Sequence, residues 1–148
     1  MDPIFSIRTI QQLMDYKKCN AFIKWNKLDG YGKNALFYHN NIYCLDYLIH
    51  QGADPHVIDH SGRNLLFDRT SSVVIKYFLH YRLDINKADF LDQTPIFYVK
   101  DLPTLKLYEE NGANLFHKNT YDQNILDRIK NDNIKNYLIE RGLKYTDI

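Results

Sequence analysis

The stretch DFLDQTPIF, residues 89–97, decides the fold because related stretches recur at a fixed spacing along the chain. The corresponding positions read DGYGKNALF at 29–37, DHSGRNLLF at 59–67 and NTYDQNILD at 119–127, so each step is 30 residues. A fixed period of this length indicates one small structural unit that is copied and stacked. A stacked array has no built-in chemistry, but it offers an extended surface of the kind that binds other macromolecules.

Each copy carries the signals of two short helices joined by turns. In the copy that starts at Asp59, the run 59–62 (Asp-His-Ser-Gly) is a turn signal in which glycine is available for a positive φ. Asn64 is suited to cap a first helix, which is expected to end near Thr70. Ser71 is suited to cap a second helix with a broad apolar stripe. The sequence therefore predicts an all-α fold.

The same pattern predicts a single domain over residues 1–148. The segment before Asp29 has apolar residues at helical spacing but breaks the period, so it is expected to cap the stack. The last copy carries Asp127 where the others carry phenylalanine, and a terminal repeat must present a polar outer face. The expected organisation is an N-terminal cap at 1–28, repeats at 29–58, 59–88 and 89–118, and a C-terminal repeat or cap at 119–148.

These residues resemble the ankyrin-repeat family. The family pattern is a turn with Asp and Gly, then Thr-Pro-Leu-His, two antiparallel helices and Gly-Ala-Asp. Here Asp-Gln-Thr-Pro-Ile-Phe at 92–97 and Gly-Ala-Asp at 52–54 match closely, and Gly-Ala-Asn at 112–114 is similar. The resemblance runs from Asp29 to the end of the chain. It implies an ankyrin-like solenoid of stacked helix-turn-helix repeats with short hairpin loops.

Departures from the family pattern carry expectations of their own. The family unit is about 33 residues, whereas this unit is 30 residues, and the loss falls between the helices, so the first helix or its connection is expected to be shortened. Phenylalanine at 37, 67 and 97 replaces the family histidine. Asp92 and Asp122 replace turn glycines, and Asp tolerates left-handed backbone better than most residues. Arg82 also stands where glycine is expected, so we expect the second half to be less regular than the first.

The resemblance also implies where a partner would bind, because the family uses its hairpin tips and the exposed side of its first helices. Carried onto this chain, the tip positions are Tyr31, Lys33, His60, Arg63, Phe90, Leu91, Gln93, Tyr121 and Asp122. The first-helix positions are Tyr38, His39, Asp68, Arg69, Tyr98 and Lys100. Aromatic and Arg side chains dominate interface hot spots. The alternative is that Tyr38 and Tyr98 pack between repeats and that Phe90 packs on the next turn.

The composition argues against nucleic-acid and membrane partners. The net charge of +1 directs the molecule toward neither kind of partner as a whole. Four lysines in the N-terminal cap could contact phosphate, but a basic stripe is lacking elsewhere, so a solvated face is the preferred interpretation; they are Lys17, Lys18, Lys24 and Lys27. We expect no transmembrane helix, because no window approaches about 18 uninterrupted apolar residues.

The two cysteines and the N-terminus favour a cytoplasmic protein. Cys19 and Cys44 do not form a CxxC pair, so both are expected to be reduced and buried, with a single disulfide between them as the alternative. The start of the chain lacks a basic region followed by a long apolar stretch, so no secretory signal is evident.

The sequence gives little support to an enzyme or a metal protein. His56 and His60 have i, i+4 spacing, but they lie in a predicted turn without a third ligand nearby, so we expect no metal and no cofactor. The patterns of common hydrolases, nucleotide-binding proteins and zinc proteases are missing. An unrecognised site that uses His39, Asp68 and Arg69 is the enzymatic alternative.

The leading functional hypothesis is a protein-binding module that acts by occlusion. Small stand-alone ankyrin-like proteins resemble immunity proteins of bacterial toxin systems, including contact-dependent inhibition. By that resemblance, a monomer would cover the active site of a toxin, expected to be a nuclease, in a 1:1 complex. The acids expected to pair with basic residues of the nuclease are Asp68, Asp92, Asp122 and Asp127. The alternative is an ankyrin adaptor or effector that binds a host protein.

Overall fold

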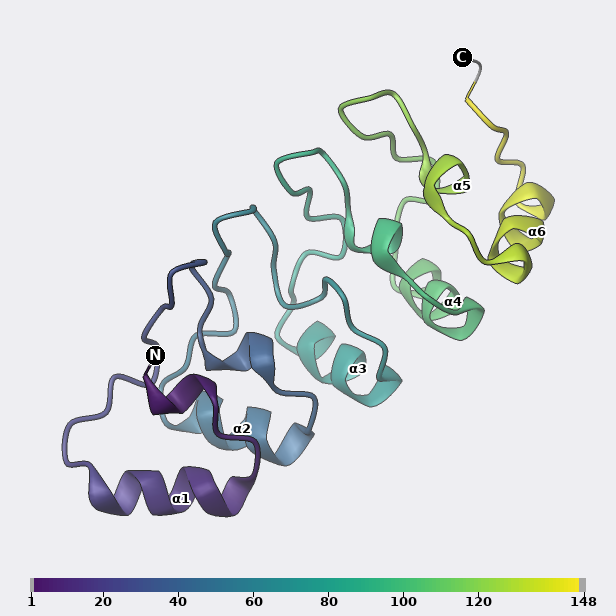
Figure 1. Cartoon of the computed structure of the whole chain (residues 1–148). Helices are drawn as coiled ribbons and strands as arrows, with labels where there is room; N and C mark the ends of the chain where they lie inside the picture. Colours follow the sequence, from purple (N-terminus) through teal and green to yellow (C-terminus); the bar gives the residue numbers. More distant parts are fainter. Residues whose placement is uncertain (1, 147–148) are drawn as a thin grey trace.

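A computed structural model describes residues 2–146, and helices are the only regular secondary structure in this range. The longer helices lie side by side in chain order, so the chain forms one row with its termini at opposite ends (Figure 1). The helices are η1 (Pro3–Phe5), α1 (Ile10–Cys19), η2 (Ala35–Tyr38), α2 (Ile42–His50), α3 (Ser72–His80), η3 (Pro95–Tyr98), α4 (Leu102–Glu110), α5 (Ile125–Arg128) and α6 (Asp132–Glu140). The prediction of an all-α fold is confirmed.

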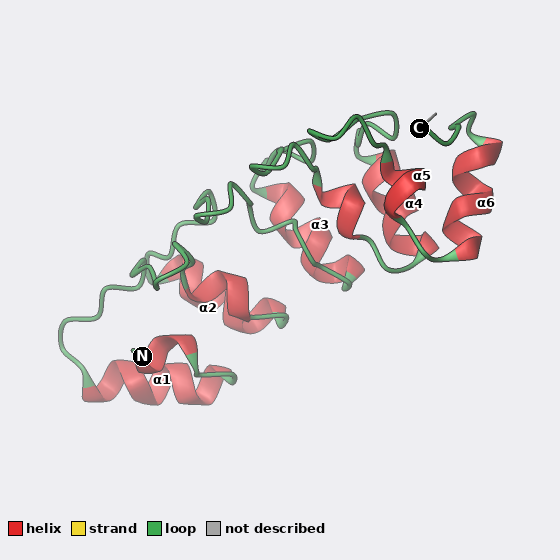
Figure 2. Cartoon of the chain, turned by 45° about the horizontal axis from the view of Figure 1, so that its top comes forward, coloured by secondary structure: helices red, strands yellow, loops and turns green. Residues whose placement is uncertain are grey.

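The 30-residue step of the sequence is also the step of the structure. Helices α2, α3, α4 and α6 are each nine residues long and begin at positions 42, 72, 102 and 132. Their N-caps recur at the same step, and the caps are Asn41, Ser71, Asp101 and Asn131. The helices line one side of the row and the long loops the other (Figure 2). We call the segments 29–58, 59–88, 89–118 and 119–146 units 1 to 4.

The first helix of each unit is reduced to a single turn. In units 1, 3 and 4 it is the four-residue element η2, η3 or α5, and in unit 2 residues 65–68 form a hydrogen-bonded turn without helix. Asp68 closes that turn with φ of 59°. The expected shortening therefore falls on the first helix. The expectation of a less regular second half is wrong, because unit 2 is the irregular one.

Each unit opens with a turn that an acidic or amide side chain holds from inside. In unit 2, Oδ1 of Asp59 accepts hydrogen bonds from the backbone N–H of Ser61 at 2.8 Å and of Arg63 at 3.0 Å. The same pair of bonds recurs on Asp29, Asp89 and Asn119. This arrangement explains why Asp or Asn stands at the first position of every copy.

Left-handed backbone is needed at the fourth residue of each turn. Gly32 and Gly62 have φ of 74° and 82°, and Asp92 and Asp122 have φ of 58° and 60°. The expectation that aspartate takes over this conformation in the last two units is confirmed. Arg82 also has a positive φ, 57°, at the position where the other units place glycine.

Consecutive turns are joined by main-chain hydrogen bonds. The N–H of His60 donates to the carbonyl of Tyr31 at 2.8 Å, and the N–H of Phe90 donates to the carbonyl of Ser61 at 3.0 Å. Thr120 makes the equivalent bond to Leu91 at 3.0 Å. These bonds hold the four loops in a row at one edge of the molecule.

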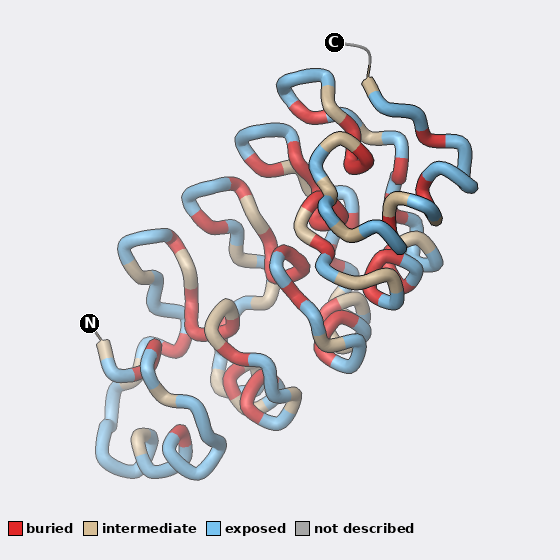
Figure 3. The backbone as a smooth tube through the Cα atoms, turned by 45° about the vertical axis from the view of Figure 1, so that its right-hand side comes forward, coloured by how far each residue is buried: buried red, intermediate tan, exposed pale blue. Residues whose placement is uncertain are grey.

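The core is a column of side chains that repeats from unit to unit. Leu36, Leu66, Ile96 and Leu126 are each at most 1% exposed and lie at the same position of their units. The buried residues run through the middle of the chain, and the loop tips are exposed (Figure 3). Burial of a Leu or Ile side chain contributes roughly 1.5–3 kcal/mol.

The cysteine expectations hold in part. Cys44 lies buried on α2, as predicted, whereas Cys19 at the end of α1 is exposed, so the prediction that both are buried is wrong for Cys19. Both thiols are free in the described part of the chain. Between residues 2 and 146, each helix is too short or too polar to cross a bilayer.

Candidate functional site

Exposed aromatic and apolar side chains gather at the tips of the loops. Tyr31 is 70% exposed, Phe90 78%, Leu91 43% and Tyr121 67%, and His60 is also exposed. These five residues come from all four units, and we call them the tip row. Exposed aromatic side chains are enriched in the surfaces by which proteins bind one another.

Two members of the tip row rest on the preceding turn. A Cβ atom at Gly32 would lie 2.4 Å from the His60 ring, and one at Gly62 would lie 3.0 Å from the Phe90 ring. Each ring therefore covers a glycine of the unit before it. Phe90 packs on a neighbouring turn, as the alternative interpretation expected, and still presents most of its surface to solvent.

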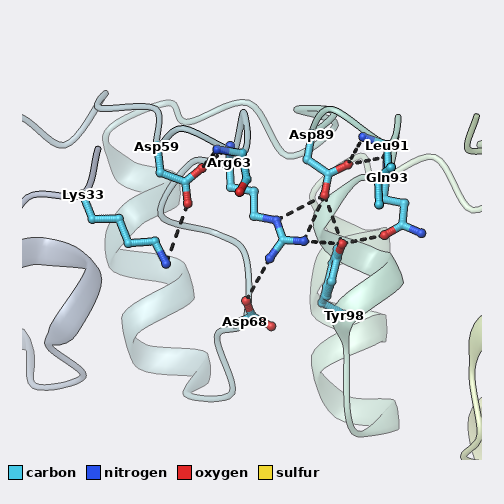
Figure 4. Close-up of polar contacts among 9 residues, drawn as sticks. Lys33, Asp59, Arg63, Asp68, Asp89, Leu91, Gln93 and Tyr98 are labelled. Carbon is cyan, nitrogen blue, oxygen red and sulfur yellow. Dashed lines mark hydrogen bonds and ion pairs between the residues drawn. The ribbon is translucent and has the colours of Figure 1, made fainter. Parts of the chain in front are cut away.

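A cluster of charged and aromatic side chains lies between the loops and the single turns of units 2 and 3 (Figure 4). Arg63 is at its centre. Its Nε and Nη2 each lie 3.1 Å from Oδ2 of Asp89, and its Nη1 lies 3.7 Å from Oδ2 of Asp68. The guanidinium also stacks 4.4 Å from the centroid of the Tyr98 ring and 5.5 Å from that of Phe67. We call this set the Arg63 cluster.

Tyr98 completes the cluster from unit 3. Its hydroxyl lies 3.0 Å from Oδ2 of Asp89 and 2.5 Å from Oε1 of Gln93, and it accepts a hydrogen bond from Nη2 of Arg63. Burial, and then the hydrogen bond to Asp89, raise the pKa of Tyr98 to about 12. The phenol therefore stays protonated at neutral pH and stabilises the Asp89 carboxylate.

Tyr38 makes the same contact in unit 1. Its hydroxyl donates to Oδ2 of Asp29, and its ring packs edge-on against Phe5 at 6.1 Å. Burial, and then the bond to Asp29, raise its pKa to about 12. Tyr38 and Tyr98 thus pack between neighbouring segments, as the alternative interpretation expected.

Unit 2 lacks this tyrosine and contains a hollow instead. Asp68 stands at the position of Tyr38 and Tyr98. The hollow has a volume of about 130 Å³. It is lined by Lys33, Phe37, Asn40, Asp59, Arg63, Phe67, Asp68 and Arg69.

The structure places three of the predicted site residues inside the protein. Arg69 is 6% exposed, His39 2% and Gln93 6%, so they are not available to a partner and their assignment to the binding surface is wrong. Arg69 and His39 lie at the seam between units 1 and 2, and Gln93 is enclosed by its own turn and Tyr98.

The guanidinium of Arg69 donates its hydrogen bonds to main-chain carbonyl oxygens and to one amide oxygen. Its Nε donates to the carbonyl of Leu65 at 2.8 Å, its Nη1 to that of His39 at 2.7 Å, and its Nη2 to that of Leu36 at 3.0 Å. A further bond from Nη1 reaches Oδ1 of Asn40 at 2.9 Å. Burial lowers the pKa of Arg69 to about 10, which leaves it charged at neutral pH.

The four acids that were expected to meet a nuclease already have partners within the chain. Asp68 faces Arg63, and Asp92 lies 3.6 Å from Nε2 of His117. Asp122 lies 3.0 Å from Nζ of Lys118. Asp127 accepts from the backbone of Asn124 and from Thr146. Asp127 is thus committed to a capping box, whereas Asp68, Asp92 and Asp122 keep more than half of their side-chain surface exposed.

The arrangement does not assemble the enzymatic alternative. His39 and Arg69 are buried at the seam, while Asp68 lies at the surface with its carboxylate toward Arg63. In the range 2–146, no group of three His, Cys, Asp or Glu side chains is placed to hold a metal ion. Lys100 is exposed on the connection to α4.

Neither comparison of the sequence with known proteins finds a match: no family model matches the chain, and no curated protein matches it.

Proposed function

We propose that the chain is an ankyrin-like repeat protein that binds another protein through the tip row and the neighbouring Arg63 cluster. The observation that carries the proposal is the tip row, in which four aromatic or apolar side chains between 43% and 78% exposed come from three of the four loops. Aromatic and Arg side chains are the groups that dominate protein interfaces.

The loops that carry these side chains are held before any partner arrives. Each turn is fixed by two bonds to an Asp or Asn side chain, and the turns are joined through their main chains. A pre-organised surface loses less conformational freedom on binding, which favours affinity. The tip row therefore suits a partner surface that is itself folded.

In this proposal the protein acts by occlusion. The pre-organised tip row would cover the active site of its partner. By resemblance to ankyrin-like immunity proteins, we propose that this partner is a bacterial toxin, and we expect it to be a nuclease. The exposed carboxylates of Asp92 and Asp122 flank Phe90, Leu91 and Tyr121 and could face basic residues of such an enzyme. The choice of toxin rests on the resemblance, while the choice of a protein partner rests on the surface.

The test combines one double variant with a matched control. We expect Phe90→Ala with Leu91→Ala to weaken binding to a candidate nuclease toxin domain at least 30-fold in calorimetric titration and to abolish protection on co-expression with it. The control is Phe22→Ala, because Phe22 is 98% exposed but lies in the N-terminal segment, away from the tips. Equal loss in both variants, or no loss in either, would overturn the proposal. Binding to a host protein with no protection against the toxin would support the adaptor alternative.

A further inference from the structure

We propose that the hollow in unit 2 is a subsite for a tyrosine side chain that the partner protein presents. This inference rests on the proposed function and adds the chemistry of one contact. The molecule itself supplies the comparison, because units 1 and 3 fill the same position with a tyrosine of their own.

The filled position in unit 3 shows what surrounds such a side chain. The Tyr98 ring lies 5.6 Å from the Phe67 ring and 4.4 Å from the Arg63 guanidinium, both contributed by the preceding unit. Its hydroxyl meets the second oxygen of Asp89, the acid that opens its own unit. The position thus consists of an aromatic wall, a cation and a buried carboxylate.

The corresponding position of unit 2 has each of these three groups, two of them supplied by unit 1, and lacks the tyrosine. One step earlier in the chain, Phe37 replaces Phe67, Lys33 replaces Arg63 and Asp59 replaces Asp89. All three line the hollow. Lys33 Nζ lies 5.6 Å from the centroid of the Phe37 ring, which parallels the 5.5 Å between Arg63 and Phe67.

The acid of unit 2 has an oxygen that is free to accept a hydrogen bond. Oδ1 of Asp59 is used by its own turn, while Oδ2 has no hydrogen-bond donor within residues 2–146 and faces Nζ of Lys33 at 3.8 Å. The Asp59 side chain is only 3% exposed. A carboxylate oxygen without a hydrogen-bond donor, in a side chain this well enclosed, favours a ligand that brings an O–H donor.

Unit 4 agrees with this pairing of acid and phenol. It carries Arg128 at the tyrosine position and the neutral Asn119 at the acid position. The amide of Asn119 lies 3.4 Å from Oε1 of Gln123, within its own loop. Unit 2 is therefore the unit that has the acid without the phenol.

The size of the hollow is close to that of a cavity that holds an aromatic ring. Its volume is about 130 Å³, and a cavity of ~150 Å³ accepts benzene. Phe37 and Phe67 give the ring apolar walls, and Lys33 and Arg63 give it cations. A phenol can pack its ring between the apolar walls and donate its hydroxyl hydrogen to the Asp59 carboxylate.

The first test uses p-cresol, the side-chain analogue of tyrosine, and follows amide shifts by NMR titration. We expect p-cresol to bind in the millimolar range and to shift the amides of residues 33–40 and 59–68. Toluene should bind at least 5-fold more weakly because it lacks the hydroxyl. Equal affinity for the two, or stronger binding of butylammonium, would overturn the proposal.

Two substitutions at the hollow sharpen this test. Asp59→Asn should weaken p-cresol binding at least 5-fold and leave the turn intact, because Asn119 already holds the equivalent turn. Asp68→Tyr should fill the hollow from within and abolish p-cresol binding, whereas Phe22→Ala changes an exposed residue that does not line the hollow and should leave binding unchanged. Circular dichroism checks that the variants are folded, and a folded Asp59→Asn variant with wild-type affinity would overturn the proposal even if Asp68→Tyr does not fold.

The partner provides the second test. We expect Asp68→Tyr to weaken the complex at least 10-fold and Phe22→Ala to leave it within 2-fold. If the tip variant loses binding and Asp68→Tyr does not, the tyrosine subsite is wrong while the proposed function stands. If the tip variant keeps full binding, the proposed function itself fails, whatever p-cresol does.

Discussion

Arg63 and Arg69 belong to the same unit, and each joins that unit to a neighbour, yet only Arg63 is available to a partner. Arg69 is buried at the seam with unit 1 and donates to carbonyl oxygens of Leu36 and His39. Arg63 keeps 26% of its side chain exposed and binds Asp89 and Tyr98 of unit 3. The difference teaches that the position of an arginine within the repeat decides whether its side chain is buried between units or accessible to a partner. The following substitutions test that difference.

The largest effect is expected at the seam. Arg69→Met leaves the carbonyls of Leu36, His39 and Leu65 without this donor, so the free energy of unfolding should fall by about 3–5 kcal/mol. Urea unfolding followed by circular dichroism measures it. Arg82→Met is the control, because Arg82 is exposed and should change the value by less than about 0.5 kcal/mol. Similar losses in both would show that the seam is not special.

The second effect is a pH dependence at the same seam. Burial, and then the charges of Arg8 and Arg69, lower the pKa of His39 to about 4. The ordinary value is near 6.5, so unfolding takes up a proton between these two pH values, and the free energy of unfolding falls as the pH is lowered through this window. The loss should reach roughly 3 kcal/mol at about pH 4.

The control for this effect is His39→Leu, which removes the titrating group from the same buried position. Urea unfolding at several pH values between 6.5 and 4.5 should give a shallower slope for this variant than for the wild type. The same slope in both proteins would contradict the seam environment assigned to His39.

A smaller loss of stability is expected from substitution of Arg63, the partly exposed arginine. Arg63→Met removes the cation beside Asp89, but that carboxylate keeps two backbone N–H donors and the Tyr98 hydroxyl. The free energy of unfolding should therefore fall by about 1–2 kcal/mol, less than for Arg69→Met. A loss equal to that of Arg69→Met in the same urea experiment would remove the distinction between the two arginines.

The smallest effect is expected at Arg82, which lies away from Arg63 and Arg69. Arg82 has φ of 57° where units 1, 3 and 4 have glycine. Arg82→Gly relieves a left-handed residue, so it should stabilise the protein by up to about 1 kcal/mol. A rise of a few degrees in the melting temperature would agree with this, and a fall would show that Arg82 makes a stabilising contribution.

Much of the frame could be predicted from the sequence, because the groups that build it act locally. Asp59 and Asn64 hold a turn and a cap within a few residues of themselves, and both roles follow from residue type and position. The core position of Leu66 follows from the apolar column that recurs every 30 residues. The sequence predicted only that the first helix or its connection is shortened. The 30-residue period fixes the length of the repeat, but it does not fix the conformation of the first helix.

The candidate site was harder to predict because the burial of its residues depends on contacts between units. Arg69 and His39 were assigned to the binding surface because the resemblance places them on the exposed side of the first helices. Their column continues with Val99 and Ile129, and Val99 is 4% exposed, so a comparison along the column would have indicated burial. The hollow in unit 2 was missed because it depends on an acid at position 59 together with the lack of a tyrosine at position 68, a combination that unit 2 alone of the four units has.

The hydrogen bonds that join consecutive turns use main-chain atoms and, between units 2 and 3, the side chains of Arg63 and Asp89. Because no side chain of the tip row takes part in them, residues such as Tyr31, Leu91 and Tyr121 can be exchanged without disturbing the scaffold. A lineage could therefore drift to a new target by replacing a few solvent-facing amino acids while the rest of the gene stays unchanged. The exceptions are His60 and Phe90, whose rings lie on Gly32 and Gly62, so each of these pairs would have to evolve together.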